Sequence, residues 1–134
     1  MNRCLQVLLL SFLTTFLTLA SSAFAQHEQV YTFTGPNGAN PLGGLIVDAN
    51  GNFYGTAGNG GDNGFGAVFE ISQAGNNPPV ETLLYSFTGG ADGAGPASGL
   101  TLDASGNLYG TTVFGGNLEG CYNSGCGVVF EIVP

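Results

Sequence analysis

The sequence has almost no positive charge. Arg3 is its only Lys or Arg residue, set against nine Asp and Glu residues, and the formal net charge is −8. Nucleic-acid binding depends on cationic side chains that displace the counterions of the phosphates. The composition therefore excludes nucleic acids as partners, and it disfavours anionic membrane surfaces and phosphorylated substrates for the same reason.

Several residue types that serve enzymes are also scarce. The chain has one histidine, His27, and no tryptophan. A Ser-His-Asp triad needs a histidine held within the fold, and His27 lies beside a predicted cleavage site. Glu70 and Glu131 could be imagined as an acid–base pair, but outward-facing positions on amphipathic strands explain them more simply. We expect no enzymatic activity, no cofactor and no metal site.

The first 25 residues have the three-part layout of a secretory signal peptide. Arg3 precedes the apolar stretch Val7–Ala20, and the small residues of SSAFA end at Ala25. The alternative is a membrane anchor, but the stretch is short for a hydrocarbon core of about 30 Å. We expect a helical leader that is cleaved after Ala25, and a mature protein that is secreted or held in the cell envelope without contacting the membrane.

The rest of the chain repeats itself. Asp48, Asn52 and Tyr54 recur 55 residues later, and VFEI at Val68–Ile71 recurs 61 residues later. A period of this size indicates one supersecondary unit per repeat. We divide residues 26–134 into repeat one (29–72), a linker (73–80) and repeat two (81–134).

Each repeat reads as a set of short strands in an all-β fold. The sequences DANGN and DASGN have turn chemistry, because Asp can bond its own backbone and Gly accepts positive φ. The predicted turn residues are Asp48, Gly51, Asn52, Asp103, Gly106 and Asn107. The predicted strands are Gln29–Phe33, Leu45–Asp48, Asn52–Thr56, Ala67–Ile71, Glu81–Phe87, Leu100–Asp103, Asn107–Thr111 and Val128–Ile132.

Four antiparallel strands per repeat, marked by this turn, resemble a β-propeller blade. The motifs FTG, GL..D..GN.YGT and VFEI also closely resemble the GloVer (Gloeo_Verruco) tandem repeat of exported bacterial proteins. The resemblance covers both copies, and it implies export and propeller-like repeats but no particular activity. The resemblance also implies a C-terminal surface anchor, but with two copies and the sequence ending at Pro134 we expect this chain to depart from the family in both respects.

Two blades alone would leave apolar sheet faces in water, since closed propellers usually need four or more. Three arrangements remain open. Copies of the chain could join head to tail, with Gln29–Phe33 of one copy beside Val128–Ile132 of another. The chain could instead be a truncated member of a longer array, or a monomer of two sheets.

Two cysteines, Cys121 and Cys126, bound an insertion that only the second repeat contains. Export to an oxidising compartment favours a local disulfide between them. A metal site would need more ligands than two thiols. A redox-active pair would need C-x-x-C spacing or a basic neighbour. Calcium binding at the DxxGN turns is a further alternative, although their spacing does not match a calcium loop.

The long Gly-rich loops would share one face of a propeller, and loops are where binding residues gather. The candidate binding residues are Asp62, Phe65, Asp92, Phe114, Glu119 and Tyr122. An acidic face with aromatics suits a neutral glycan or a cation, although tryptophan is missing. We therefore expect a secreted, non-enzymatic repeat protein with a structural or binding role. The alternatives are a lectin-like glycan binder that closes by oligomerisation, and a fragment of a larger extracellular repeat protein or hydrolase.

Overall fold

The computed structural model describes residues 28–73, 77–119 and 121–133, so the predicted signal peptide lies outside the described residues. Within these ranges the regular elements are eight strands and one 3-10 turn, which confirms the all-β prediction. No helix in the described part of the chain is long and apolar enough to cross a membrane.

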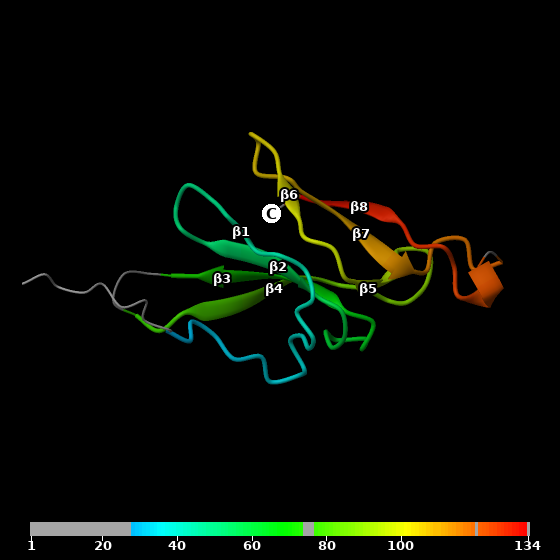
Figure 1. Cartoon of the computed structure of the whole chain (residues 1–134), viewed down its shortest axis with the longest axis horizontal. Coiled ribbons are helices and arrows are strands. Elements are labelled where there is room, and N and C mark those ends of the chain that lie inside the picture. The colour runs from blue at the N-terminus through cyan, green and yellow to red at the C-terminus, as the bar shows by residue number, and fades with distance from the viewer. Residues whose placement is uncertain (1–27, 74–76, 120, 134) are drawn as a thin grey trace, which may run out of the picture.

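The first sheet, which we call unit one, contains four antiparallel strands in the order β1-β2-β3-β4 (Figure 1). Its strands are β1 (Ile46–Val47), β2 (Phe53–Ala57), β3 (Ala67–Ser72) and β4 (Val80–Ser86). β2 and β3 pair over their whole common length, from Phe53 with Ile71 to Ala57 with Ala67. The register of β4 on β3 shifts once, between Val68 and Phe69.

The second sheet, unit two, is arranged around its longest strand. Its strands are β5 (Ala94–Pro96), β6 (Thr101–Leu102), β7 (Leu108–Phe114) and β8 (Val129–Ile132). β5 and β6 pair with successive parts of β7, and β8 pairs with the other edge of β7. β6, β7 and β8 thus repeat the places of β1, β2 and β3.

Alternation along the strands gives each sheet two faces with different composition. In unit one the A face carries Phe53, Phe69 and Ile71, and the B face carries Tyr54 and Val68. The equivalent faces of unit two carry Leu108, Phe130 and Ile132 (A face), and Tyr109, Thr111 and Val129 (B face).

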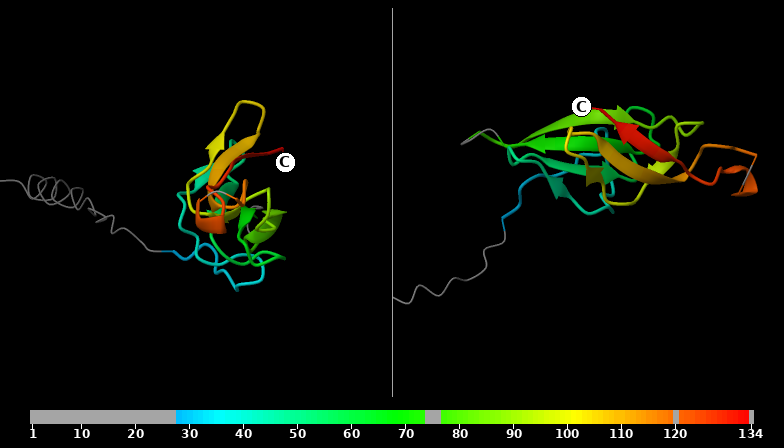
Figure 2. Two further views of the ribbon diagram at one scale, coloured as in Figure 1. Left: turned by 90° about the vertical axis from the view of Figure 1, so that its right-hand side faces the viewer. Right: turned by 90° about the horizontal axis from the view of Figure 1, so that it is seen from above.

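The A face of unit two packs against the B face of unit one. The buried core between them contains Tyr54, Val68 and Phe87 from unit one with Leu100 and Leu108 from unit two. Figures 1 and 2 show the second sheet lying beside the first. Because unlike faces meet, the contact is heterologous, which is the kind that a further copy could extend.

The A face of unit one is covered differently, by the segment that precedes β1. Tyr31 and Phe33 pack with Phe53 against Ala57, Phe69 and Ile71 in a second, smaller core. The prediction of a strand at Gln29–Phe33 is wrong for this chain, since the structure assigns no strand there. The segment lies over a sheet face, where the backbone groups of β2 and β3 are already paired with one another.

Candidate binding surface

The two DxxGN turns are each held by one carboxylate. Asp103 Oδ1 accepts hydrogen bonds from the backbone N–H groups of Ser105 and Asn107, both at 2.8 Å. Its Oδ2 accepts from the side-chain amide of Asn107 at 2.9 Å and the Tyr109 hydroxyl at 3.3 Å. Gly106 has φ +91°, a conformation that glycine adopts without strain.

The first repeat builds the same turn. Asp48 accepts bonds from the backbone of Asn50 and Asn52 at 2.8 and 2.9 Å, and from the Tyr54 hydroxyl at 3.2 Å. Gly51 has φ +88°. The motif D-x-x-G-N-x-Y therefore encodes a closed hydrogen-bonded turn, with both carboxylate oxygens occupied by the turn itself.

These bonds lower the pKa of both carboxyl groups. For Asp103, the backbone N–H of Asn107 is the largest cause and outweighs desolvation, with further contributions from Ser105 and Tyr109. For Asp48, desolvation is the largest single effect and raises the pKa, but the combined bonds from Asn50, Asn52 and Tyr54 outweigh it. Hydrogen bonds to a carboxylate favour its charged form.

The candidate loop residues do not all have the same role in the structure. Asp62, Phe65, Phe114, Glu119 and Tyr122 are exposed. Asp92 instead holds its own loop, because its carboxylate accepts bonds from the Thr88 backbone at 2.8 Å and the Tyr85 hydroxyl at 3.1 Å. Asp92 is thus occupied by a local turn.

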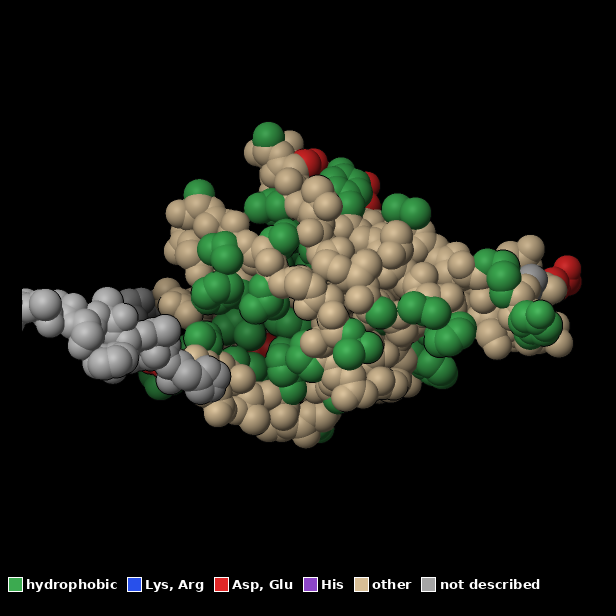
Figure 3. All heavy atoms as spheres, in the orientation of Figure 1, with side chains coloured by type: hydrophobic (Ala, Val, Ile, Leu, Met, Phe, Trp, Pro, Cys, Tyr) green, Lys and Arg blue, Asp and Glu red, His purple; other side chains and the backbone are tan. Residues whose placement is uncertain are grey.

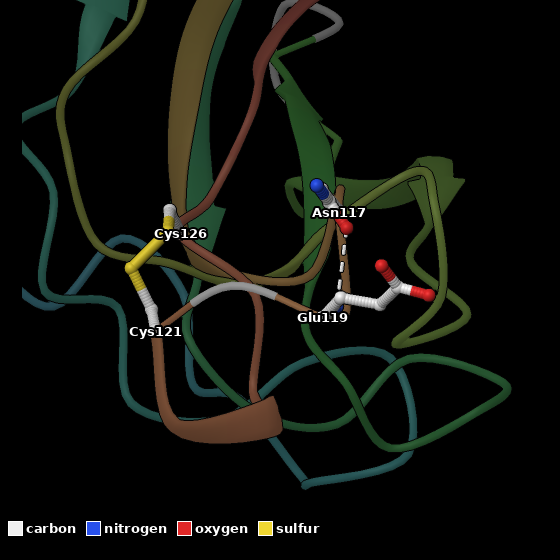
Figure 4. The surroundings of a disulfide bond; sticks show 4 residues. All are labelled: Asn117, Glu119, Cys121 and Cys126. Carbon is white, nitrogen blue, oxygen red and sulfur yellow. Dashed lines mark hydrogen bonds between the residues drawn. A yellow bond between two sulfur atoms is a disulfide. The ribbon is translucent and has the colours of Figure 1, made fainter.

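The insertion of repeat two is closed by the predicted disulfide. Cys121 and Cys126 are joined with a Cα–Cα distance of 5.3 Å. Figure 4 shows the Glu119 carboxylate pointing away from this disulfide, while the Glu119 backbone donates to Asn117 at 3.1 Å. Between the cysteines, Tyr122 has φ +61° and a fully exposed side chain.

The sheet faces at the two ends of the stack form a second candidate surface. Val68 is 0% exposed in the B face of unit one, whereas the equivalent Val129 of unit two is 80% exposed. In the A face, Leu100 of unit two is 6% exposed, whereas the equivalent Leu45 of unit one is 54% exposed. The same positions are thus buried where the two units meet and exposed at either end.

A cavity of about 440 Å³ opens in the A face of unit one. Figure 3 shows hydrophobic side chains gathered around a hollow on the molecular surface. The residues that line the cavity include Val30, Tyr31, Phe33, Leu45, Phe53, Phe69 and Ile71. Its mostly apolar lining can bury apolar groups, and the described residues gather no three His, Cys, Asp or Glu side chains that could hold a metal ion.

The duplicated turn, the duplicated faces and their stacking identify the kind of protein. The model of the Gloeobacter/Verrucomicrobia repeat matches residues 15–134. The chain belongs to this repeat family. No curated protein and no solved structure matches it. The two sheets pack face to face, while the propeller-like arrangement stays a prediction and a closed ring stays one of the open alternatives.

Two repeat residues that the sequence analysis did not single out are Gly55 and Gly110, in the YGT motif. A Cβ at Gly55 would lie 2.6 Å from Cζ of Phe69 and 2.7 Å from Leu45. A Cβ at Gly110 would lie 2.5 Å from Cζ of Phe130. In both copies the glycine leaves room for the phenylalanine of VFEI to lie across the neighbouring strand. The available signal was that the YGT and VFEI motifs both recur in the two copies.

Proposed function

We propose that this member of the Gloeobacter/Verrucomicrobia repeat family is a non-enzymatic structural or binding protein outside the cytoplasm. Its exposed repeat faces would bind further copies of the repeat. The observation that carries the proposal is the contrast between Val68, which is fully buried by the next unit, and Val129, which is 80% exposed at the equivalent position. Exposed apolar patches of this kind mark interaction surfaces.

The location outside the cytoplasm is supported by the disulfide between Cys121 and Cys126. Disulfides form and persist in oxidising compartments and are rare in the cytosol. The leader-like segment up to Ala25 supports the same location from the sequence.

The non-enzymatic role is supported by how the described carboxylates are used. Asp48, Asp92 and Asp103 each accept hydrogen bonds from their own turns. Glu70 pairs with Tyr54 in unit one and Glu131 with Tyr109 in unit two, so the two glutamates lie in different sheets. Nothing in this arrangement resembles the facing carboxylates that glycoside hydrolysis requires.

Sedimentation velocity on the chain purified after export from a bacterial host tests the proposal. We expect the mass of the sedimenting species to increase with protein concentration, because the exposed repeat faces of separate chains should bind to each other. A folded chain that stays monomeric up to millimolar concentration would contradict the proposal. Circular dichroism with a β spectrum serves as the control for folding.

The loop that carries Tyr122 favours one second candidate, a neutral glycan. Tyr122 is fully exposed on a loop closed by a disulfide, and Phe114 is 50% exposed at the end of β7. Aromatic rings on a restrained loop can stack on a sugar without large ordering costs. A glycan-array signal that Tyr122→Ala abolishes and Val133→Ala retains would support this candidate, and a blank array would exclude it.

A further inference from the structure

The segment before β1 makes the same aromatic contacts as the end of β4. Phe87 packs edge-on against Phe130 of unit two, with ring centroids 5.1 Å apart and planes at 65°. Phe33 packs against Phe69 of unit one at 4.8 Å and 66°. Tyr85 packs on Phe87 as Tyr31 packs on Phe33, at 5.1 and 5.4 Å. In sequence these residues also match, since LYSFTG at 84–89 corresponds to VYTFTG at 30–35.

This equivalence indicates which strand residues 29–33 correspond to. β4 is the fourth strand of unit one, and its continuation at Phe87 reaches into the core shared with unit two. Residues 29–33 hold the same place on the A face of unit one, but within residues 28–73, 77–119 and 121–133 no sheet lies behind them. They are positioned as the fourth strand of a preceding sheet.

The cavity in the A face matches the contact between the units position by position. Its lining residues Phe33, Leu45, Phe53, Phe69 and Ile71 correspond to Phe87, Leu100, Leu108, Phe130 and Ile132. The second set packs around Tyr54 and Val68 in the core between the units. The cavity is therefore shaped for the equivalent pair on a B face, which is Tyr109 and Val129.

Unit two has the complementary feature, an unpaired strand edge. In the described residues β8 pairs with β7 alone, whereas its counterpart β3 pairs with both β2 and β4. A groove of about 310 Å³ runs along β8, lined by Val129, Phe130 and Glu131 together with Tyr85 and Phe87 of unit one. A strand edge with unpaired backbone groups is a template for pairing with another chain.

We propose that unit two of one copy binds unit one of a second copy by the same contact that joins the two units within the chain. Residues 29–33 of the second copy become the fourth strand beside β8. Transferring the β3–β4 register gives Val128 opposite Thr32, Val129 opposite Tyr31 and Phe130 opposite Gln29. Val129 and Tyr109 enter the cavity of the second copy.

The hydrogen bonds between the two units also have equivalents in the proposed contact between copies. Thr56 Oγ1 donates to the carbonyl of Ser98 at 2.9 Å, and Gly95 N–H donates to the carbonyl of Phe65 at 2.8 Å. The equivalent bonds between copies run from Thr111 Oγ1 to the carbonyl of Gly43 and from Asn40 N–H to the carbonyl of Cys126. Glu131 faces Glu28 where Glu70 faces Thr82, and like charges opposite one another weaken a strand pair. This pair should therefore make the contact between copies weaker than the contact within the chain.

This inference rests on the proposed function and names the partner and the contact. The test mixes two singly substituted chains, Thr32→Cys and Val128→Cys, under mild oxidation. We expect a disulfide-linked dimer that forms only in the mixture. The matched control replaces Thr32→Cys by Thr34→Cys, which lies two residues further along and should cross-link at least tenfold less. A dimer that is absent, or equally abundant with both partners, would overturn the register.

A second pair of variants separates the two proposals. Val129→Asp places a charge on the exposed B face and should abolish self-association, while Leu118→Asp, on the loop between β7 and Cys121, should leave it unchanged. If Val129→Asp still associates and no cross-link forms, this inference fails and the proposed function stands. If the unmodified chain never associates, both fail.

Discussion

At the scale of single residues, one carboxylate per repeat closes the turn between the first two strands. Asp103 accepts two backbone bonds of 2.8 Å and a side-chain bond of 2.9 Å within its own turn. The bonds favour the carboxylate over the carboxylic acid, so the folded chain holds the pKa of Asp103 below its ordinary value. The turn is therefore held more strongly when the carboxyl group is ionised.

The first prediction concerns Asp103→Asn. Because the folded pKa is lowered, the stability that Asp103 contributes is present above its unfolded pKa of about 3.9 and is lost as pH falls through the folded pKa. The substitution should lower the thermal midpoint at pH 7, and the difference from the unmodified chain should shrink below about pH 4. Thermal unfolding followed by circular dichroism at several pH values measures this.

The control for this prediction is Asp62→Asn, at an exposed carboxylate outside the two turns. It should leave the midpoint at pH 7 nearly unchanged. If Asp103→Asn and Asp62→Asn behave alike, the turn carboxylate does not stabilise the fold.

The second prediction concerns Gly110→Ala. The added Cβ would meet Phe130 at 2.5 Å and Leu100 at 2.9 Å in the core between the units. Overpacking of this kind costs about 1–3 kcal/mol of unfolding free energy, which urea denaturation can measure. Gly44→Ala is the matched control, because a Cβ there meets nothing within 4 Å. Equal effects of the two substitutions would contradict the close-packing explanation of the YGT motif.

At the scale of elements, residues 117–126 of repeat two, which contain the Cys121–Cys126 disulfide, form a loop apart from the sheets. Neither of the two core clusters includes a residue between Asn117 and Cys126. Cys121, Tyr122 and Asn123 all have positive φ, at 48°, 61° and 62°. Non-glycine residues adopt this conformation at a cost of about 1–2 kcal/mol each, so the disulfide offsets backbone strain within the loop.

The third prediction is that removing the disulfide releases this loop without unfolding the sheets. The double variant Cys121→Ser, Cys126→Ser should lose at most roughly 2 kcal/mol, the chain-entropy value for so short a closed loop. Limited proteolysis should then cut near Tyr122 while β7 and β8 stay protected. Loss of the β spectrum on reduction would show instead that the loop supports the fold.

Sequence reasoning predicted the elements best where both copies carry the same chemistry. The turns at Asp48 and Asp103, and the strands that flank them, follow from Asp and Gly at fixed positions. It missed β5, because Ala94–Pro96 has no alternation and pairs only where β7 extends past Gly110. In repeat one the residue equivalent to Ala94 is Ala39, which forms an isolated β-bridge with Asn59. The match between Ala39 and Ala94 was therefore the available sequence signal for β5.

The prediction for Gln29–Phe33 failed for a different reason. Its sequence has the alternation of a strand, but a strand also needs an unpaired edge, and periodicity carries no information on which edge that is. For the candidate residue Asp92, the sequence did not indicate the bonds to Thr88 and Tyr85 that the structure shows, and its place on a binding face stays a prediction. Local chemistry therefore predicted the turns and most strands, whereas partners distant in sequence decided the rest.

At the scale of the whole molecule, two equivalent valines allow folding and self-association to be tested separately. Val68 lies between the units and Val129 lies on the outer B face. The fourth prediction is that Val68→Ala destabilises the chain by about 1–3 kcal/mol at every protein concentration, since it leaves a cavity in a core. Val129→Ala should do so only where the chain associates. Thermal midpoints across a hundredfold concentration range measure both, and parallel behaviour of the two variants would contradict the stacking of equivalent faces.

The place of β4 has a mechanical consequence. The strand that completes unit one leads directly into β5 and β6 of unit two, so the covalent chain crosses the junction between the sheets while it is still bonded to the first. A force that draws the two sheets apart therefore reaches unit one through β4, where the hydrogen bonds between β4 and β3 resist it.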